Sequence, residues 1–184
     1  MAMTRKSEST ATRSRDGKNG QTRLFQTRHD LEEEVRRQMI ELCNRQLADT
    51  FDLYSQNKQA HWNVKGRDFF QLHELFDTLA AGVLPFVDLI AERATALGGQ
   101  ATGTARMAAA SSRLSDLPLE VVDGMQVVEA MAGCYAIIAE TTRQAIEEAE
   151  QAGDQDTMDI FVEVSRELDK HLYFLESHLQ GAER

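Results

Sequence analysis

Apolar residues recur along this chain at intervals of three and four, and the pattern continues over four long stretches. These stretches cover about residues 29–60, 68–97, 121–151 and 155–179. Such spacing places apolar side chains on one face of an α-helix. Ala, Leu, Glu, Gln and Arg dominate the composition, and Pro85 and Pro118 are the only prolines. The pattern therefore predicts four long amphipathic helices and an all-α fold.

The connections between these helices differ in length. Asn63 and Gly66 indicate a turn after the first helix, and Gly153 ends the third. Residues 98–119 form a much longer connection of small and polar residues, with one short helix predicted at 105–110. A connection of that length can traverse a bundle, so the second and third helices need not form a hairpin. We expect a ferritin-like four-helix bundle over residues 29–184, with a long central crossover that carries a short helix.

Pro85 falls within the second predicted helix. Because proline lacks a backbone N–H donor and clashes with the preceding turn, it predicts a kink or a local distortion there. The paired glycines Gly98 and Gly99 follow the same helix and are suited to end it.

Charge is spread unevenly over the 184 residues. Residues 1–28 hold seven basic and two acidic residues, a net +5, whereas the remaining 156 hold 13 basic and 28 acidic, a net −15. The first segment has too few apolar residues for a core, so we expect a disordered basic arm. Two interpretations stay open for it: a solubilising or expression-derived tail, or an arm that binds DNA phosphates. The DNA interpretation, which many arms on one oligomer favour, assigns the contacts to its basic residues, Arg5, Lys6, Arg13, Arg15, Lys18, Arg23 and Arg28.

Cysteine usage and hydropathy predict the compartment. Cys43 and Cys134 both lie on apolar helical stripes, as expected for buried thiols in a reducing environment. No apolar run reaches transmembrane length, and the polar N-terminal segment lacks the hydrophobic core of a signal peptide. We expect a cytoplasmic protein with no membrane partner.

Candidate metal ligands are concentrated on the second helix. With His73 set at 0°, Asp77 lies near 40°, Asp88 near 60° and Glu92 near 100°, so all four share one side of the helix. Fifteen residues separate His73 from Asp88, which is about 22 Å along the axis and beyond the reach of side chains. These residues therefore cannot share a metal ion within one chain.

A second copy of this helix, crossing antiparallel about a two-fold axis, would bring the two halves together. His73 and Asp77 of one copy would then face Asp88 and Glu92 of the other. Such a crossing needs small residues midway, and Ala80, Ala81 and Gly82 stand there. His61, just before the helix, could complete the histidine half of each site.

The ligand set suits iron(II), with zinc or manganese as competitors. A solvated polar face is the alternative, but the intervening Ala81 and Leu84 are apolar and favour an interface. A di-iron site inside one bundle usually needs E-x-x-H on two helices, and this chain has no such pair.

Other polar residues carry weaker signals. Trp62 is interpreted as a packing residue or as an electron donor beside a metal. The acidic cluster around the last turn is either solvated surface or a means of focusing cations at a symmetry axis; it comprises Glu147, Glu148, Glu150, Asp154, Asp156 and Asp159. His29, His171 and His178 are expected to be structural or exposed.

Four segments together resemble the Dps family, the DNA-binding mini-ferritins of starved bacteria: HWNVKG, LHELFD, VDLIAERATALGG and VSRELDKHLYFLESHL. The resemblance covers about residues 29–180. It implies a hollow homododecamer with an iron-oxidation site at each two-fold interface. It further implies that Fe(II) enters through acidic three-fold pores, is oxidised by hydrogen peroxide or dioxygen, and is stored as an Fe(III) mineral. This ferroxidase and storage chemistry would protect DNA from oxidative damage.

Carried onto this sequence, the resemblance assigns His61 and His73 to one subunit and Asp88 and Glu92 to its partner. Asp77 would hold a weaker metal position or a bridging water, with Lys58 and Trp62 next to the ligands. The resemblance also assigns Asp154, Asp156 and Asp159 to the three-fold pore. Members of the family differ in their N-terminal arms, and only some bind DNA. Two rival functions therefore remain: a nucleoid-condensing protein with incidental metal binding, and a zinc- or manganese-binding assembly that does not turn over iron.

Overall fold

The computed structural model describes residues 23–180 of the chain. Helices account for most of this range: α1 is Glu33–Asn63, α2 is Phe69–Ala96, α3 is Ala105–Ser111, α4 is Gly124–Ala152 and α5 is Gln155–Leu179. Within residues 23–180 the extended pairing is limited to an isolated bridge between Lys65 and Asp123. The predicted all-α fold with a short helix in the central crossover is confirmed.

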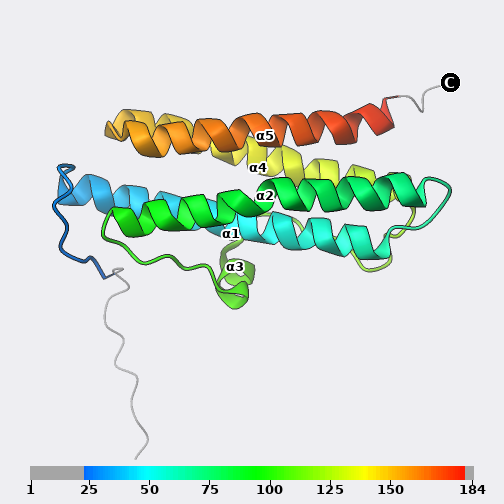
Figure 1. Ribbon diagram of the computed structural model, residues 1–184, viewed down its shortest axis with the longest axis horizontal. Coiled ribbons are helices and arrows are strands. Elements are labelled where there is room, and N and C mark those ends of the chain that lie inside the picture. Colours follow the sequence, from blue (N-terminus) through cyan, green and yellow to red (C-terminus); the bar gives the residue numbers. More distant parts are fainter. Residues whose placement is uncertain (1–22, 181–184) are drawn as a thin grey trace, which may run out of the picture.

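The long helices α1, α2, α4 and α5 form the bundle, whose arrangement Figure 1 shows. The antiparallel pair α1 and α2 packs against the antiparallel pair α4 and α5, and α3 lies on the outer side of α1. The crossover runs from the end of α2 back along the bundle, so α2 and α4 point in the same direction (Figure 1). This connectivity is that of a ferritin-like bundle with one long crossover.

The start of α1 differs from the prediction. Helix begins at Glu33 rather than near residue 29, because the preceding segment packs against the end of α2. The backbone N–H of Phe25 donates to the carbonyl oxygen of Gly98 over 2.7 Å, and Arg36 donates to the carbonyl oxygen of Leu97 over 3.0 Å. A Cβ on Gly98, whose φ is +89°, would lie 2.8 Å from the oxygen of Phe25.

Residues 23–28, assigned from sequence to the disordered arm, are therefore held against the bundle. Of the seven predicted DNA-contacting residues, Arg23 and Arg28 lie in this segment. The other five, Arg5, Lys6, Arg13, Arg15 and Lys18, lie outside the described residues.

The remaining helix ends follow local signals. The side chain of Asp123 accepts from the backbone N–H of Gln126 at the start of α4, and that of Asp154 accepts from Thr157 at the start of α5. Gly153, with φ +77°, ends α4 in the left-handed conformation. The helix α2 continues through Pro85, which lies on its exposed side.

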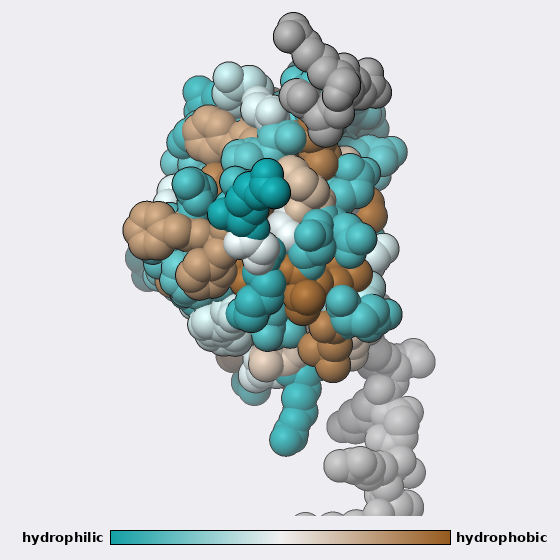
Figure 2. All heavy atoms as spheres, turned by 90° about the vertical axis from the view of Figure 1, so that its right-hand side faces the viewer, coloured by the Kyte–Doolittle hydropathy of each residue, from teal (hydrophilic) through white to brown (hydrophobic). Residues whose placement is uncertain are grey.

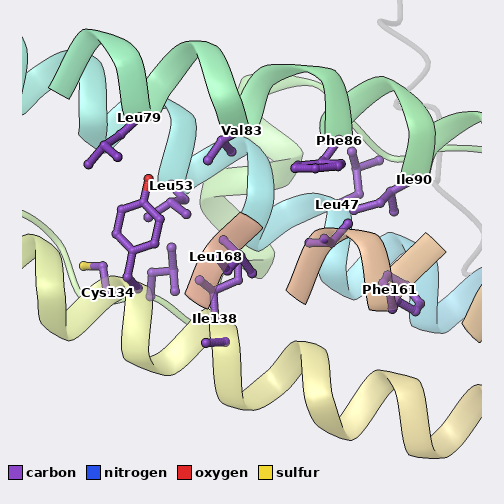
Figure 3. Packing of buried hydrophobic residues seen from close by; sticks show 14 of the residues in the cluster. Leu47, Leu53, Leu79, Val83, Phe86, Ile90, Cys134, Ile138, Phe161 and Leu168 are labelled. Atoms are coloured by element: carbon purple, nitrogen blue, oxygen red, sulfur yellow. The ribbon is translucent and has the colours of Figure 1, made fainter. Parts of the chain in front are cut away.

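Apolar side chains from all four long helices fill the centre of the bundle. Figure 3 shows Leu47 and Leu53 of α1 near Val83 and Phe86 of α2, with Ile138, Phe161 and Leu168 contributed by α4 and α5. Both cysteines are buried there and free, as predicted. Burial raises the pKa of Cys43 to about 12 and that of Cys134 to about 11.

Among the helices in residues 23–180, none is both long enough and apolar enough to span a lipid bilayer.

Candidate functional site

The turn between α1 and α2 brings the two predicted histidine ligands together. Gly66, with φ +116°, lets the chain reverse there, and Lys65 N–H donates to the carbonyl oxygen of Val122 over 2.8 Å, which fixes the turn to the start of α4. The rings of His61 and His73 stack with centroids 3.7 Å apart. The residues predicted to form one half of the site are therefore adjacent.

Each histidine is oriented by the backbone of the other. Nδ1 of His61 lies 2.7 Å from the carbonyl oxygen of His73, and Nδ1 of His73 lies 2.8 Å from the carbonyl oxygen of His61. Because a carbonyl oxygen only accepts hydrogen bonds, each Nδ1 carries the proton. In the neutral form of such a ring the lone pair lies on Nε2. Proteins use the same arrangement to orient histidines that bind metal ions.

Asp77 lies one turn beyond His73 and is paired with Lys58. The distance from Lys58 Nζ to Asp77 Oδ1 is 2.5 Å. The hydrogen bond from Lys58 holds the pKa of Asp77 below its usual value, and the charges of Lys58, His61 and His73 act in the same direction. Asp77 is thus a carboxylate at neutral pH. Lys58 keeps it beside the histidines.

Trp62 does not pack into the interior of this chain. Its side chain is 62% exposed, and Lys58 Nζ lies 5.9 Å from the centre of its ring system. Figure 2 shows this end of the bundle, where apolar side chains lie at the surface among hydrophilic ones. Phe69 and Phe70, which begin α2, are also exposed at 40% and 67%. Apolar surface therefore surrounds the histidine pair.

Asp88 and Glu92 lie exposed farther along α2, about four turns beyond His73. Across residues 23–180 of the single chain, no three His, Cys, Asp or Glu side chains form a group able to hold a metal ion. One chain thus carries a histidine half and a carboxylate half that are separated along the same helix.

The surface of α2 between these halves is apolar and exposed. It is formed by Ala81, Leu84, which is 45% exposed, and Pro85. Ala80 is buried, and a Cβ on Gly82 would lie 2.7 Å from Cε1 of His171 in the same chain. Of the three small residues predicted for the crossing, Ala81 therefore faces outward, whereas Gly82 makes room for a histidine of its own bundle.

The predicted pore residues have different environments. Asp154 is 2% exposed and forms an ion pair with Arg93 over 2.6 Å, besides capping α5. Asp156 is 81% exposed, and Asp159 is exposed on the next turn of α5. In this chain Asp154 thus has a buried structural partner, whereas Asp156 faces solvent with only a longer contact to Arg93 at 3.6 Å, and Asp159 is exposed.

The sequence analysis missed a polar cluster inside the bundle. His171 is 1% exposed and contacts Tyr135 of α4 and Glu167 of α5, and Tyr135 in turn contacts Asn57 of α1. The only signal was the spacing of four between Glu167 and His171, which does not identify partners on other helices. His178 is exposed and His29 half-buried, as expected for residues outside a site.

Comparisons with known proteins agree with the fold and the motifs. The family model described as a ferritin-like domain matches residues 40–184. A DNA protection during starvation protein from Agrobacterium fabrum is 38% identical over 158 residues, which cover 86% of this chain and 98% of that protein.

Solved structures extend the comparison. DpsC from Streptomyces coelicolor superimposes with a TM-score of 0.80 at 28% identity, covering 89% of this chain and 95% of that one. An archaeal Dps homologue from Halobacterium salinarum gives a TM-score of 0.81 at 28% identity, covering 93% and 94%. This chain therefore belongs to the ferritin-like family and, within it, to the Dps proteins.

Proposed function

We propose that this protein is a ferroxidase that oxidises Fe(II) with hydrogen peroxide or dioxygen and stores the Fe(III) inside a hollow homododecamer. The observation that carries the proposal is the reciprocal hydrogen bonding of His61 and His73. It leaves both Nε2 lone pairs available beside the carboxylate of Asp77, at a surface bordered by exposed apolar residues. Imidazole and carboxylate together suit ferrous iron, for which zinc is a competitor.

A second copy of α2 supplies the missing carboxylates in this proposal. The midpoint between His73 and Asp88 falls between Ala80 and Ala81, so an antiparallel crossing there sets Asp88 of one copy opposite His73 of the other. Such a two-fold contact is self-complementary and creates two equivalent sites. It also covers the exposed apolar surface at Ala81 and Leu84.

The same crossing pairs the carboxylate of Glu92 with the region of Phe69, where α2 begins beside the histidine pair. Each site would then hold two imidazoles and two carboxylates, with Asp77 at its edge. Fe(II) is the substrate, so the task of these ligands is to bind it reversibly and to tolerate the change to Fe(III). Carboxylates favour the higher charge, which helps oxidation.

The protection of DNA from hydroxyl radical follows from the number of electrons that each peroxide receives. Two Fe(II) ions give one electron each to one hydrogen peroxide, which takes up two protons and leaves as two water molecules. Because no single electron is delivered alone, hydroxyl radical is not released. The exposed Asp156 and Asp159 would attract incoming Fe(II) if they line an opening of the assembly.

An anaerobic Fe(II) titration followed by peroxide, with the particle mass measured on the same sample, tests this function. We expect rapid oxidation by the assembled protein and a large loss of rate in Asp88→Asn. Glu163→Gln, which changes an exposed carboxylate of α5, is the matched control and should keep the wild-type rate. Equal rates in the two variants would remove Asp88 from the site. Binding of zinc or manganese with no oxidation of iron by the wild type would favour a metal-binding assembly instead.

DNA binding is a second proposed function, supported by the +5 charge of residues 1–28 and by the name of the Agrobacterium relative. Residues 23–28 pack beside the end of α2, so the described end of the basic segment lies near the start of α1. Gel retardation at two salt concentrations, with and without residues 1–22, tests it. We expect retardation of the full chain that weakens as salt rises. No retardation at low salt would exclude a DNA role.

A further inference from the structure

A chain of buried polar side chains crosses the interior of the bundle, and none of its members is a ligand of the proposed iron site. Asn57, Tyr135 and His171 are 0%, 0% and 1% exposed. Nδ2 of Asn57 lies 3.0 Å from Oη of Tyr135, which lies 3.3 Å from Nδ1 of His171. Nε2 of His171 lies 2.9 Å from Oε1 of Glu167. Three helices thus supply one continuous hydrogen-bonded series.

The direction of each hydrogen bond is fixed by chemistry. The hydrogen bond from Lys170 keeps the pKa of Glu167 low, so Glu167 is an acceptor and Nε2 of His171 carries the proton. Burial lowers the pKa of His171, so its ring is neutral and Nδ1 offers a lone pair. The phenol of Tyr135 must then donate to Nδ1, while the amide of Asn57 donates to the phenol oxygen.

We propose that Tyr135 is a redox-active residue, which gives one electron to a strong one-electron oxidant while its phenolic proton passes to Nδ1 of His171. The O–H bond of Tyr135 breaks and an N–H bond forms on His171. The products are a neutral phenoxyl radical and an imidazolium ion. The carboxylate of Glu167 stabilises the imidazolium, and the amide of Asn57 keeps its hydrogen bond to the phenoxyl oxygen.

The oxidant is a hydroxyl radical, and this step rests on the proposed function. When a peroxide meets a site that holds only one Fe(II), it accepts one electron and splits into hydroxide and hydroxyl radical. An electron from Tyr135 converts that radical to a second hydroxide, so charge and atoms balance. A later electron from Fe(II) restores the phenol, and His171 returns the proton.

The position of the cluster suits this role. Asn57 stands one turn before His61 on α1, a rise of about 6 Å, so the phenol lies within one or two helical turns of the proposed site. Burial raises the pKa of Tyr135, so the phenol cannot ionise first, and its oxidation requires a base at hydrogen-bond distance. His171 is that base. The same burial separates the radical from solvent and from other molecules.

Two details of packing favour a redox role over a purely structural one. Within residues 23–180, the amide oxygen Oδ1 of Asn57 has no hydrogen-bond partner, and an unpaired buried acceptor lowers stability. The amide is oriented instead to use its N–H donors. One of them is used on the phenol oxygen, where a donor stabilises the oxidised product. Gly82 leaves the space that the His171 ring occupies, and any side chain there would displace it.

Freeze-quench electron paramagnetic resonance on the full-length assembly tests the proposal. Fe(II) is added below the number of sites, followed by excess peroxide. The chain has three tyrosines, so Tyr54→Phe/Tyr173→Phe leaves Tyr135 alone. We expect a tyrosyl signal in this variant that narrows when the protein carries ring-deuterated tyrosine. We expect loss of the signal on adding Tyr135→Phe, and in His171→Gln a lower yield with loss of the hyperfine coupling to the proton on Nδ1.

Absence of a tyrosyl signal from the variant that retains only Tyr135 would overturn the proposal, as would an unchanged signal in Tyr135→Phe. Stopped-flow measurement of Fe(II) oxidation on the same samples separates the ferroxidase proposal from the redox role of Tyr135. Oxidation at the wild-type rate without a tyrosyl radical refutes only the redox role. If iron is not oxidised at all, the proposed function fails. A photogenerated ruthenium(III) oxidant then replaces iron and peroxide, with the same expected signal and the same refuting result. Thermal melts and particle mass identify any variant that has not folded.

Discussion

Two glycines in helix interiors should respond oppositely to the same substitution. Alanine is favoured over glycine inside a helix by about 0.5–1 kcal/mol. Gly133 in α4 has no heavy atom within 4 Å of an added Cβ, so Gly133→Ala should gain about that amount. At Gly82, the added Cβ would lie 2.7 Å from Cε1 and 2.9 Å from Nε2 of His171.

The ring of His171 cannot move away without loss, because Glu167 and Tyr135 hold its two nitrogens. Breaking both buried hydrogen bonds costs about 2–6 kcal/mol, since each broken bond leaves a buried group unsatisfied at about 1–3 kcal/mol. After the helix gain is subtracted, Gly82→Ala should lose about 1–5 kcal/mol.

Thermal unfolding of the two variants and the wild type, in one buffer and at one protein concentration, measures both effects. A change of 1 kcal/mol shifts the midpoint of a domain of this size by about 2–4 °C. We expect a lower midpoint for Gly82→Ala and a higher one for Gly133→Ala. If both alanine variants are stabilised equally, the packing of His171 against α2 is wrong.

Asp154→Asn keeps an acceptor at the start of α5 but removes the closer and buried partner charge of Arg93, leaving the exposed Asp156 at 3.6 Å, so it should cost up to about 3 kcal/mol. Asp159→Asn, an exposed control, should change the thermal midpoint little, and equal effects would contradict the buried ion pair. Burial lowers the pKa of His171 from its usual 6.5 despite the opposing charge of Glu167, so the unfolded chain binds more protons and stability falls as pH drops below about 6.5. Urea midpoints against pH should show this loss in the wild type and a flatter profile in His171→Gln; parallel profiles would show that His171 is not the group responsible. With pKa values raised to about 12 and 11, Cys43 and Cys134 should resist a thiol reagent at neutral pH until the chain is unfolded. Rapid labelling of the folded assembly would contradict their burial.

The sequence predicted those features that depend on local periodicity. Apolar spacing located all four long helices, and the small-residue connection after Gly98 indicated the crossover and its short helix. The start of α1 could not be predicted in this way. Asp30 and the following glutamates satisfy the rules for a helix start, but the contact between Phe25 and Gly98 holds the preceding chain extended. That contact joins residues 73 positions apart, and no local rule reports it.

The geometry of the candidate site was predictable in part for the same reason. Helical geometry placed the carboxylates of α2 on one face, and the short turn at Gly66 placed His61 near His73. The reciprocal bonds between the two histidines depend on the axial offset of α1 and α2, which tertiary packing sets. The partners of His171 lie 36 and 4 positions away in the sequence, on two different helices, so the sequence pattern could not predict that His171 is buried. Gly82 was predicted to serve the crossing between two copies of α2, but it makes room for His171 of its own chain. A glycine is compatible with a close helix crossing and with a neighbouring buried side chain, so the sequence alone does not distinguish the two.

Mixing two inactive variants tests most directly whether each iron site is shared between chains. One variant carries His61→Ala and His73→Ala, and the other carries Asp88→Asn and Glu92→Gln. In a mixed two-fold pair, one site combines both defects while the other receives intact histidines and intact carboxylates. Random co-assembly at equal amounts should therefore restore about a quarter of the wild-type rate of Fe(II) oxidation by peroxide. Sites built within a single chain would leave the mixed particles as inactive as either parent.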